Sequence, residues 1–246
     1  MKNFHPIALL CAAAAFLQGC VMYSDKDEFE DPQLDAINII YPSCVEPVLR
    51  MAELADFYDR YQSIREDRER AEALGTAYFG DAFDPMKLFY EEFTVNPSWG
   101  MICSEDTEGT YVAYPSQDFQ DMDTEYHIIA LGGRRYSISC ETSGGGGWRS
   151  FRTEAEVYVD DSDRLHISSL DIVYNEDVEG RNVSVEVKSA EDNLSLPLCK
   201  AGEYSYYPVS GMLMFTVTGT VSDVFPVRFS EDSIEIGSNV YPVNQQ

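Results

Sequence analysis

The chain has 246 residues, of which 43 are acidic and 17 are basic, so its formal net charge is −26 at pH 7. This excess of carboxylates excludes nucleic acid as a natural partner and argues against adsorption to anionic lipid, because both surfaces attract Lys and Arg. The 16 Tyr and 13 Phe residues supply enough core for a folded domain and exclude a disordered chain.

An apolar run at residues 7–17 is preceded by Lys2. The run is too short for a transmembrane helix, which needs about 20 residues, and is typical of a signal-peptide core. Leu17-Gln18-Gly19-Cys20, where the run ends, resembles the lipobox of bacterial lipoproteins. The resemblance implies a signal peptide over residues 1–19, cleavage before Cys20 and acylation of its thiol. An ordinary secretory signal that ends in Cys is the alternative.

Residues 20–35 are polar and acidic, and we expect an extended tether there. An acidic cluster just after the lipidated Cys also resembles the surface-export signal of outer-membrane lipoproteins in the Bacteroidota. The two resemblances imply a cell-envelope protein anchored in the outer membrane through acyl chains, which hold a domain firmly when two or three are present. The periplasmic face and the cell surface are both left open.

Beyond Cys20 the chain contains an even number of cysteines, which in an oxidising compartment predicts two disulfides. Four cysteines allow three connectivities, and the sequence does not choose among them. Free thiols are the alternative in an anaerobic envelope. A zinc site is not favoured, because the cysteines lack Cys-x-x-Cys spacing and neighbouring histidines. The candidates are Cys44, Cys103, Cys140 and Cys199.

Residues 36–246 are predicted to form one domain, with its helical part over about residues 43–93. Ser43 and Glu46 form a capping box, which marks the start of a helix. Apolar residues recur at helical spacing over residues 48–61, and charged residues such as Asp56 are expected on the other side. We expect this helix to cover one face or end of a sheet.

From residue 97 to residue 246 the apolar period is two, and short β-type segments alternate with turn residues. The pattern predicts an α+β, mainly β fold, in which the helix packs on an antiparallel sandwich or barrel of about ten strands. Gly132-Gly133 and residues 160–163 are expected to be turns. The predicted segments are residues 99–103, 111–114, 126–131, 136–141, 155–159, 165–174, 182–188, 212–218, 224–229, 233–236 and 240–243.

The segment at residues 165–174 has apolar residues in both phases of its alternation. Leu165 and Ile167 lie in one phase, and Leu170 and Ile172 lie in the other. This pattern predicts a central strand that is covered on both faces for part of its length.

Motifs for a serine nucleophile, a zinc protease or a phosphate-binding loop are not found in the chain. His127 and His166 fall among apolar residues of predicted strands and are interpreted as structural. We therefore predict no enzymatic activity and no cofactor. A carboxylate pair for an envelope hydrolase is the alternative, and the 43 acidic residues give it no particular location.

Two sets of residues are candidates for binding. An oxygen-rich loop before a predicted strand is suited to Ca²⁺, with a merely solvated loop as the alternative. The loop residues are Asp118, Asp121, Asp123 and Glu125. A tetraglycine loop followed by an aromatic and a cation, together with a Tyr-rich segment, is suited to a sugar or protein surface, although Trp148 in the core is the alternative. These residues are Trp148, Arg149, Tyr204, Tyr206 and Tyr207.

The sequence therefore predicts a lipid-anchored envelope lipoprotein that acts as a non-enzymatic binding or assembly module for a protein or glycan. The alternatives are the hydrolase and a structural subunit of the fimbrial type. The fimbrial type shares the β-rich lipoprotein pattern, but the long charged helix fits it poorly.

Overall fold

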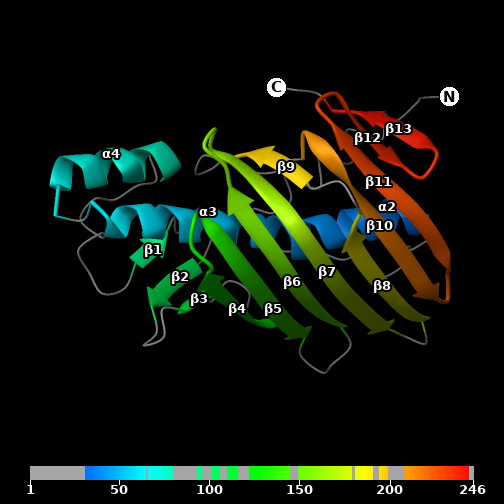
Figure 1. The fold of residues 1–246 in the computed structure, drawn as a ribbon. Coiled ribbons are helices and arrows are strands. Elements are labelled where there is room, and N and C mark those ends of the chain that lie inside the picture. Colours follow the sequence, from blue (N-terminus) through cyan, green and yellow to red (C-terminus); the bar gives the residue numbers. More distant parts are fainter. Residues whose placement is uncertain are drawn as a thin grey trace, which may run out of the picture.

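The computed structural model describes residues 31–64, 66–79, 93–95, 101–105, 110–115, 122–144, 149–178, 181–190, 194–198 and 208–243. Within them the helices come first and the strands follow, so the fold is α+β and mainly β, as predicted. Figure 1 shows the helices on one side of one large sheet. The helices, rather than a second sheet, cover the buried face of that sheet.

The helical layer consists of α2 (Pro32–Ile40), the π-helical turn η2 (Tyr41–Val45), α3 (Glu46–Gln62) and α4 (Arg68–Phe79). Asp31 caps α2, because its side chain accepts hydrogen bonds from the backbone N–H groups of Gln33 and Leu34. The predicted helix start at Ser43 is therefore wrong. Ser43 lies inside a continuous helical segment that begins eleven residues earlier.

The π-helical turn is explained by two prolines, Pro42 within it and Pro47 just after it. A proline lacks the N–H that an α-helix needs and crowds the carbonyl four residues before it, so the helix widens locally. Glu46 accordingly donates its N–H to the carbonyl of Tyr41, five residues back. The widened turn places Cys44 against the sheet, where it is buried.

Within the described residues, thirteen strands form one antiparallel sheet in which neighbours largely follow the order of the chain. The exception is β9, which pairs with β7 and β10, so that β8 pairs directly with β10. The strands are β1 (Phe93–Val95), β2 (Met101–Glu105), β3 (Thr110–Pro115), β4 (Met122–Ala130), β5 (Arg135–Gly144), β6 (Arg149–Val159), β7 (Arg164–Val178), β8 (Arg181–Ser189), β9 (Leu194–Pro197), β10 (Ser210–Gly219), β11 (Asp223–Ser230), β12 (Ser233–Ile236) and β13 (Asn239–Pro242). Each of the eleven predicted segments overlaps a strand, although β4 and β6 begin four and six residues earlier than predicted, whereas the sequence pattern does not reveal β1 and β9.

The predicted two-sided burial of residues 165–174 is wrong, and a β-bulge is the reason. Glu156 of β6 pairs with Ser169, but the next residue, Val157, pairs with Ile167, so Ser168 is an extra residue in β7. An extra residue reverses the alternation of side chains beyond it. The apolar residues of both phases therefore point to the same buried face: Leu165, Ile167, Leu170, Ile172 and Tyr174.

The core lies between the sheet and the helical layer. The start of the layer, α2, packs on β10 and β11, and α3 packs on β4, β5 and β6. Along β6 every second residue is buried, from Arg149 to Val159, and the residues between them are partly or fully exposed. Every residue of α3 from 48 to 57 is buried, so the middle of this helix is enclosed on all sides.

Candidate functional site

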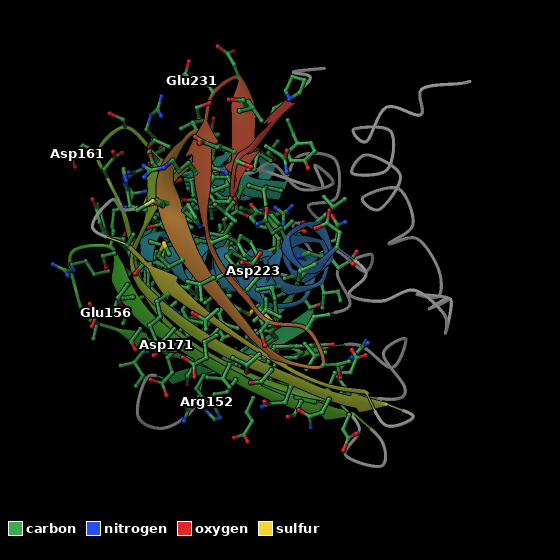
Figure 2. The ribbon with its side chains drawn as sticks, turned by 90° about the vertical axis from the view of Figure 1, so that its right-hand side faces the viewer. Arg152, Glu156, Asp161, Asp171, Asp223 and Glu231 are labelled. Atoms are coloured by element: carbon green, nitrogen blue, oxygen red, sulfur yellow. The ribbon has the colours of Figure 1, made fainter. Side chains whose placement is uncertain are left out.

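The face of the sheet that points away from the helices is exposed along β5 to β8. None of the described helices covers it. Figure 2 shows Arg152, Glu156 and Asp171 on this side of the sheet. We call it the outer face, defined by these exposed residues of β5 to β8: Arg135, Glu141, Arg152, Glu154, Glu156, Asp171, Asn175, Asp177, Glu186 and Lys188.

Carboxylates outnumber cations on the outer face and are only loosely neutralised. Lys188 approaches Asp171 at 3.9 Å, and Arg152 approaches Glu154 at 3.9 Å. Glu154 and Asp171 also stand directly opposite each other on β6 and β7. Like charges in opposing positions repel, and at least half of each of these side chains is exposed. The outer face is therefore suited to a partner that presents cations or hydrogen-bond donors.

A second polar site lies where α3 meets the turns at one end of the sheet. Its centre is Asp56 of α3, which is 0% exposed. A buried carboxylate needs partners, because burial of an unpaired charge costs several kcal/mol. We call the site the Asp56 cluster; it comprises Asp56, Arg60, Tyr78, Arg134, Tyr136 and Asp163.

Both carboxylate oxygens of Asp56 are occupied. Arg134 donates from Nε to Oδ1 and from Nη2 to Oδ2, each at 2.8 Å. The hydroxyl of Tyr136 donates to Oδ1 at 3.3 Å, and that of Tyr78 donates to Oδ2. Burial, together with the charge of Asp56, raises the pKa of both tyrosines, so each hydroxyl keeps the proton that it donates.

The Asp56 cluster extends to the surface through two arginines. Nη2 of Arg134 also donates to Asp163 at 2.7 Å, and its Nη1 donates to the carbonyl of Asp160 at 2.9 Å. Arg60 donates to Asp163 at 3.3 Å and to the hydroxyl of Tyr78 at 2.9 Å. The cluster thus joins α3 and α4 to the β4–β5 and β6–β7 turns.

The chemistry of the Asp56 cluster is that of an ion-pair network. Hydrogen bonds with Asp56 raise the pKa of Arg134, so its guanidinium stays charged. A sequence signal for this burial exists. Apolar residues surround the helix at 48–57, and a helix that is apolar on all sides is buried together with its charged residues.

Arg149, which the sequence assigns to a binding surface, lies on the buried face of β6. Its Nη2 donates to Glu176 of β7 at 2.9 Å, and the Tyr174 hydroxyl donates to the same carboxylate oxygen at 2.5 Å. The side chains of Arg149 and Glu176 are both almost completely buried. Arg149 therefore stabilises the core beside its own strand.

The other sequence-predicted binding residues lie largely outside the description. Trp148, Tyr204, Tyr206, Tyr207, Asp118 and Asp121 are not described, and Asp123 and Glu125 are described only as backbone of β4. Among the described residues, no group of three or more potential ligands is placed to hold a metal ion. The Ca²⁺ and aromatic-surface predictions stay predictions.

The histidines have different surroundings. His127 is exposed on β4. Nε2 of His166 lies 2.9 Å from Oδ2 of Asp160, and its ring stacks on Tyr158 with the centroids 4.6 Å apart. These contacts are of the structural kind that the sequence predicts for His166.

Two of the predicted disulfide cysteines, Cys44 and Cys140, are described in full, and both are buried free thiols. The side chain of Cys103 on β2, together with Cys20 and Cys199, lies outside the description. Lipidation at Cys20 stays a prediction.

In comparisons with known proteins, no family model, no curated protein and no solved structure matches this chain. Within the described part of the chain, no helix has the length and apolarity needed to cross a bilayer.

Proposed function

We propose that the protein is a lipid-anchored lipoprotein of the bacterial cell envelope, attached at Cys20, and that its domain is a non-enzymatic binding or assembly module. The proposed location in the cell envelope is supported by the resemblance of Leu17-Gln18-Gly19-Cys20 to a lipobox. One observation carries the binding role. The outer face of the sheet is exposed and acidic, whereas the opposite face is buried against the helices in the core.

A sheet face suits recognition because its side chains project at regular intervals from a rigid hydrogen-bonded scaffold. On the outer face, exposed carboxylates such as Glu154 and Asp171 have only one distant cation each, at 3.9 Å, and gain from a partner that supplies hydrogen-bond donors. An envelope protein with a basic patch and a glycan rich in hydroxyl donors both meet this requirement. Charge complementarity of this kind chiefly raises the rate of encounter and makes binding sensitive to salt.

The test of the binding role uses the full-length protein, extracted from the envelope in detergent, in a pull-down of envelope proteins and on a glycan array. We expect a Glu154→Lys/Asp171→Lys variant to lose at least tenfold in affinity. A matched control, Asp161→Lys/Glu231→Lys, reverses two exposed acids in turns away from the outer face and should retain binding (Figure 2). Failure to capture any protein or glycan, or an equal loss in both variants, overturns the proposal.

Metabolic labelling with a fatty acid tests the lipid anchor at Cys20 and the attachment of the protein to the membrane. Wild-type protein should be labelled and should sediment with the membrane fraction, whereas Cys20→Ser should do neither. An unlabelled wild-type protein would remove the basis of the anchor, whatever the outer face binds.

A further inference from the structure

Cys140 occupies the middle of a row of three residues that crosses the buried face of the sheet. In the register of β4, β5 and β6, Tyr126 and Thr153 stand directly opposite Cys140 on its two sides. All three side chains are buried. Residues paired in this way have their Cβ atoms about 5 Å apart, so the row is compact.

Cys44 of the π-helical turn lies over the same row. Its thiol is beside the Thr153 hydroxyl, and both cysteines act electrostatically on Tyr126. The Thr153 hydroxyl makes no hydrogen bond of ordinary geometry, so sulfur is its polar neighbour in the core. Cys44 and Cys140 therefore share Thr153 as a neighbour, Cys44 through the contact of its thiol and Cys140 through strand pairing, and the two thiols interact electrostatically across the boundary between the helical layer and the sheet.

Burial determines when these two thiols are able to react. Cys44 is 1% exposed and Cys140 is 3% exposed. Burial raises the pKa of Cys140 to about 11, and burial together with Cys140 raises that of Cys44 still further. Since the thiolate is the reactive form, both thiols are inert once the helix has docked and reactive only before that.

We propose that Cys44 and Cys140 pair as a disulfide in the exported protein and thereby fasten the helical layer to the sheet. The inference rests on the envelope location proposed above, because disulfides persist in oxidising compartments. It selects one of the three connectivities that the sequence leaves open, and it leaves Cys103 and Cys199 as the remaining two cysteines of the mature chain.

The bond forms by thiol–disulfide exchange with an oxidised dithiol protein or a small disulfide such as glutathione disulfide. One cysteine, as its thiolate, attacks the oxidant's disulfide and forms a mixed disulfide, releasing one of its sulfurs as a thiol. The second cysteine then attacks the first cysteine's sulfur and releases the other. Two thiols of the chain become one disulfide, the oxidant gains the two electrons, and the two protons end on its thiols.

The four cysteines fall in four different tryptic peptides, so one peptide map distinguishes every pairing. Residues 27–50 contain Cys44, residues 88–134 contain Cys103, residues 136–149 contain Cys140 and residues 189–200 contain Cys199. Protein extracted from the envelope is alkylated under denaturing conditions before digestion without reductant. We expect peptides 27–50 and 136–149 to be joined. Free alkylated thiols in both, or linkage of either to another peptide, overturns the proposal.

A second experiment tests the pairing of Cys44 with Cys140 independently of the proposed envelope location and binding role. The reduced full-length chain is refolded in a glutathione redox buffer and mapped in the same way, which requires neither an envelope nor a partner. The same joined peptides are expected. Success here with free thiols in the cell overturns the bond in the exported protein and leaves the geometry standing, whereas a different pairing here contradicts the geometry.

Thermal unfolding of cysteine variants tests whether the stabilising bridge is the one between Cys44 and Cys140. Addition of reductant to the oxidised protein should lower its Tm by about 5–15 °C, to the value of a Cys44→Ala/Cys140→Ala variant, because the bridge closes a loop of almost a hundred residues. Cys103→Ala should keep a reductant-sensitive loss of this kind. If reductant also lowers the Tm of the Cys44→Ala/Cys140→Ala variant by the same amount, the stabilising bridge lies elsewhere.

Discussion

Asp56 and Arg134 lie 78 residues apart in the chain and form a two-point ion pair, in which two nitrogens of the guanidinium donate to the two carboxylate oxygens at 2.8 Å each. Arg134 has a positive φ of 59°, a conformation that is unusual for residues other than Gly. The ion pair therefore holds a sharp turn of the sheet against the middle of an enclosed helix.

We expect Arg134→Ala to lower the free energy of unfolding by about 3–5 kcal/mol, because it leaves the buried Asp56 carboxylate without its main partner. Denaturant unfolding followed by circular dichroism measures the change. Arg135→Ala is the matched control. Its side chain is more than half exposed and approaches Glu156 only at 3.9 Å, so its loss should cost less than about 0.5 kcal/mol. Equal losses in the two variants would contradict a stabilising role for Arg134.

The strands were largely predictable because their alternation of apolar and polar residues is a local property. The register between strands is not local, and Ser168 shows the consequence. One extra residue at the bulge turns both apolar phases of β7 toward one face, and the sequence of β7 alone carries no sign of it. β9 was missed for a related reason, since it has only four residues and pairs with parts of two strands.

The sequence pattern does not predict the Asp56 cluster. The helical spacing of residues 48–61 predicts one buried apolar face and one exposed charged face, and it places Asp56 on the exposed face. Asp56 is three residues from Glu53 and six from Arg50, so the three share one side of the helix, yet all three are buried. A charged residue is buried only where a partner exists, and Arg134 is too distant in sequence to be recognised as that partner. The charges of the outer face, in contrast, follow directly from the alternation along β6.

The Arg149–Glu176 pair provides a second test of buried charge. Glu176→Gln keeps the shape of the side chain but removes the charge that Arg149 faces inside the core, so we expect a loss of roughly 3 kcal/mol in unfolding free energy. Glu186→Gln is its control, because Glu186 is exposed on β8 and should contribute less than about 0.5 kcal/mol. A neutral effect of Glu176→Gln would show that the buried charge is not needed for stability.

Two turn glycines are expected to differ in their tolerance of alanine. Gly219 has a φ of 122°, and a Cβ there would lie 2.0 Å from the backbone oxygen of Asn182, which has no room to move. Gly133 has a φ of 62° and open space around its Cβ position. We therefore expect Gly133→Ala to cost about 1 kcal/mol from its left-handed backbone, and Gly219→Ala to cost clearly more. Denaturant midpoints of the two variants measure the difference, and the reverse order would contradict this account.

The pH dependence of stability is expected to contain a contribution from Asp160. The hydrogen bond with His166, followed by those from the backbone N–H groups of Arg164 and Ser162, lowers the pKa of Asp160 to about 2. The unfolded chain has a higher value, near 3.8, so it binds a proton first as the pH falls. The contribution of Asp160 is thus fully present above about pH 5 and is lost progressively toward pH 2.

We expect wild type to be more stable than Asp160→Asn by the same amount at pH 6 and pH 5, and the difference to shrink at pH 4 and again at pH 3. Urea unfolding at each pH measures it. Asp161→Asn, which changes the exposed neighbour in the same turn, should show no such convergence. A difference between wild type and Asp160→Asn that stays constant with pH would mean that Asp160 acts through the shape of the turn, since its two backbone hydrogen bonds survive in the amide. Convergence would instead assign the effect to the carboxylate charge facing His166.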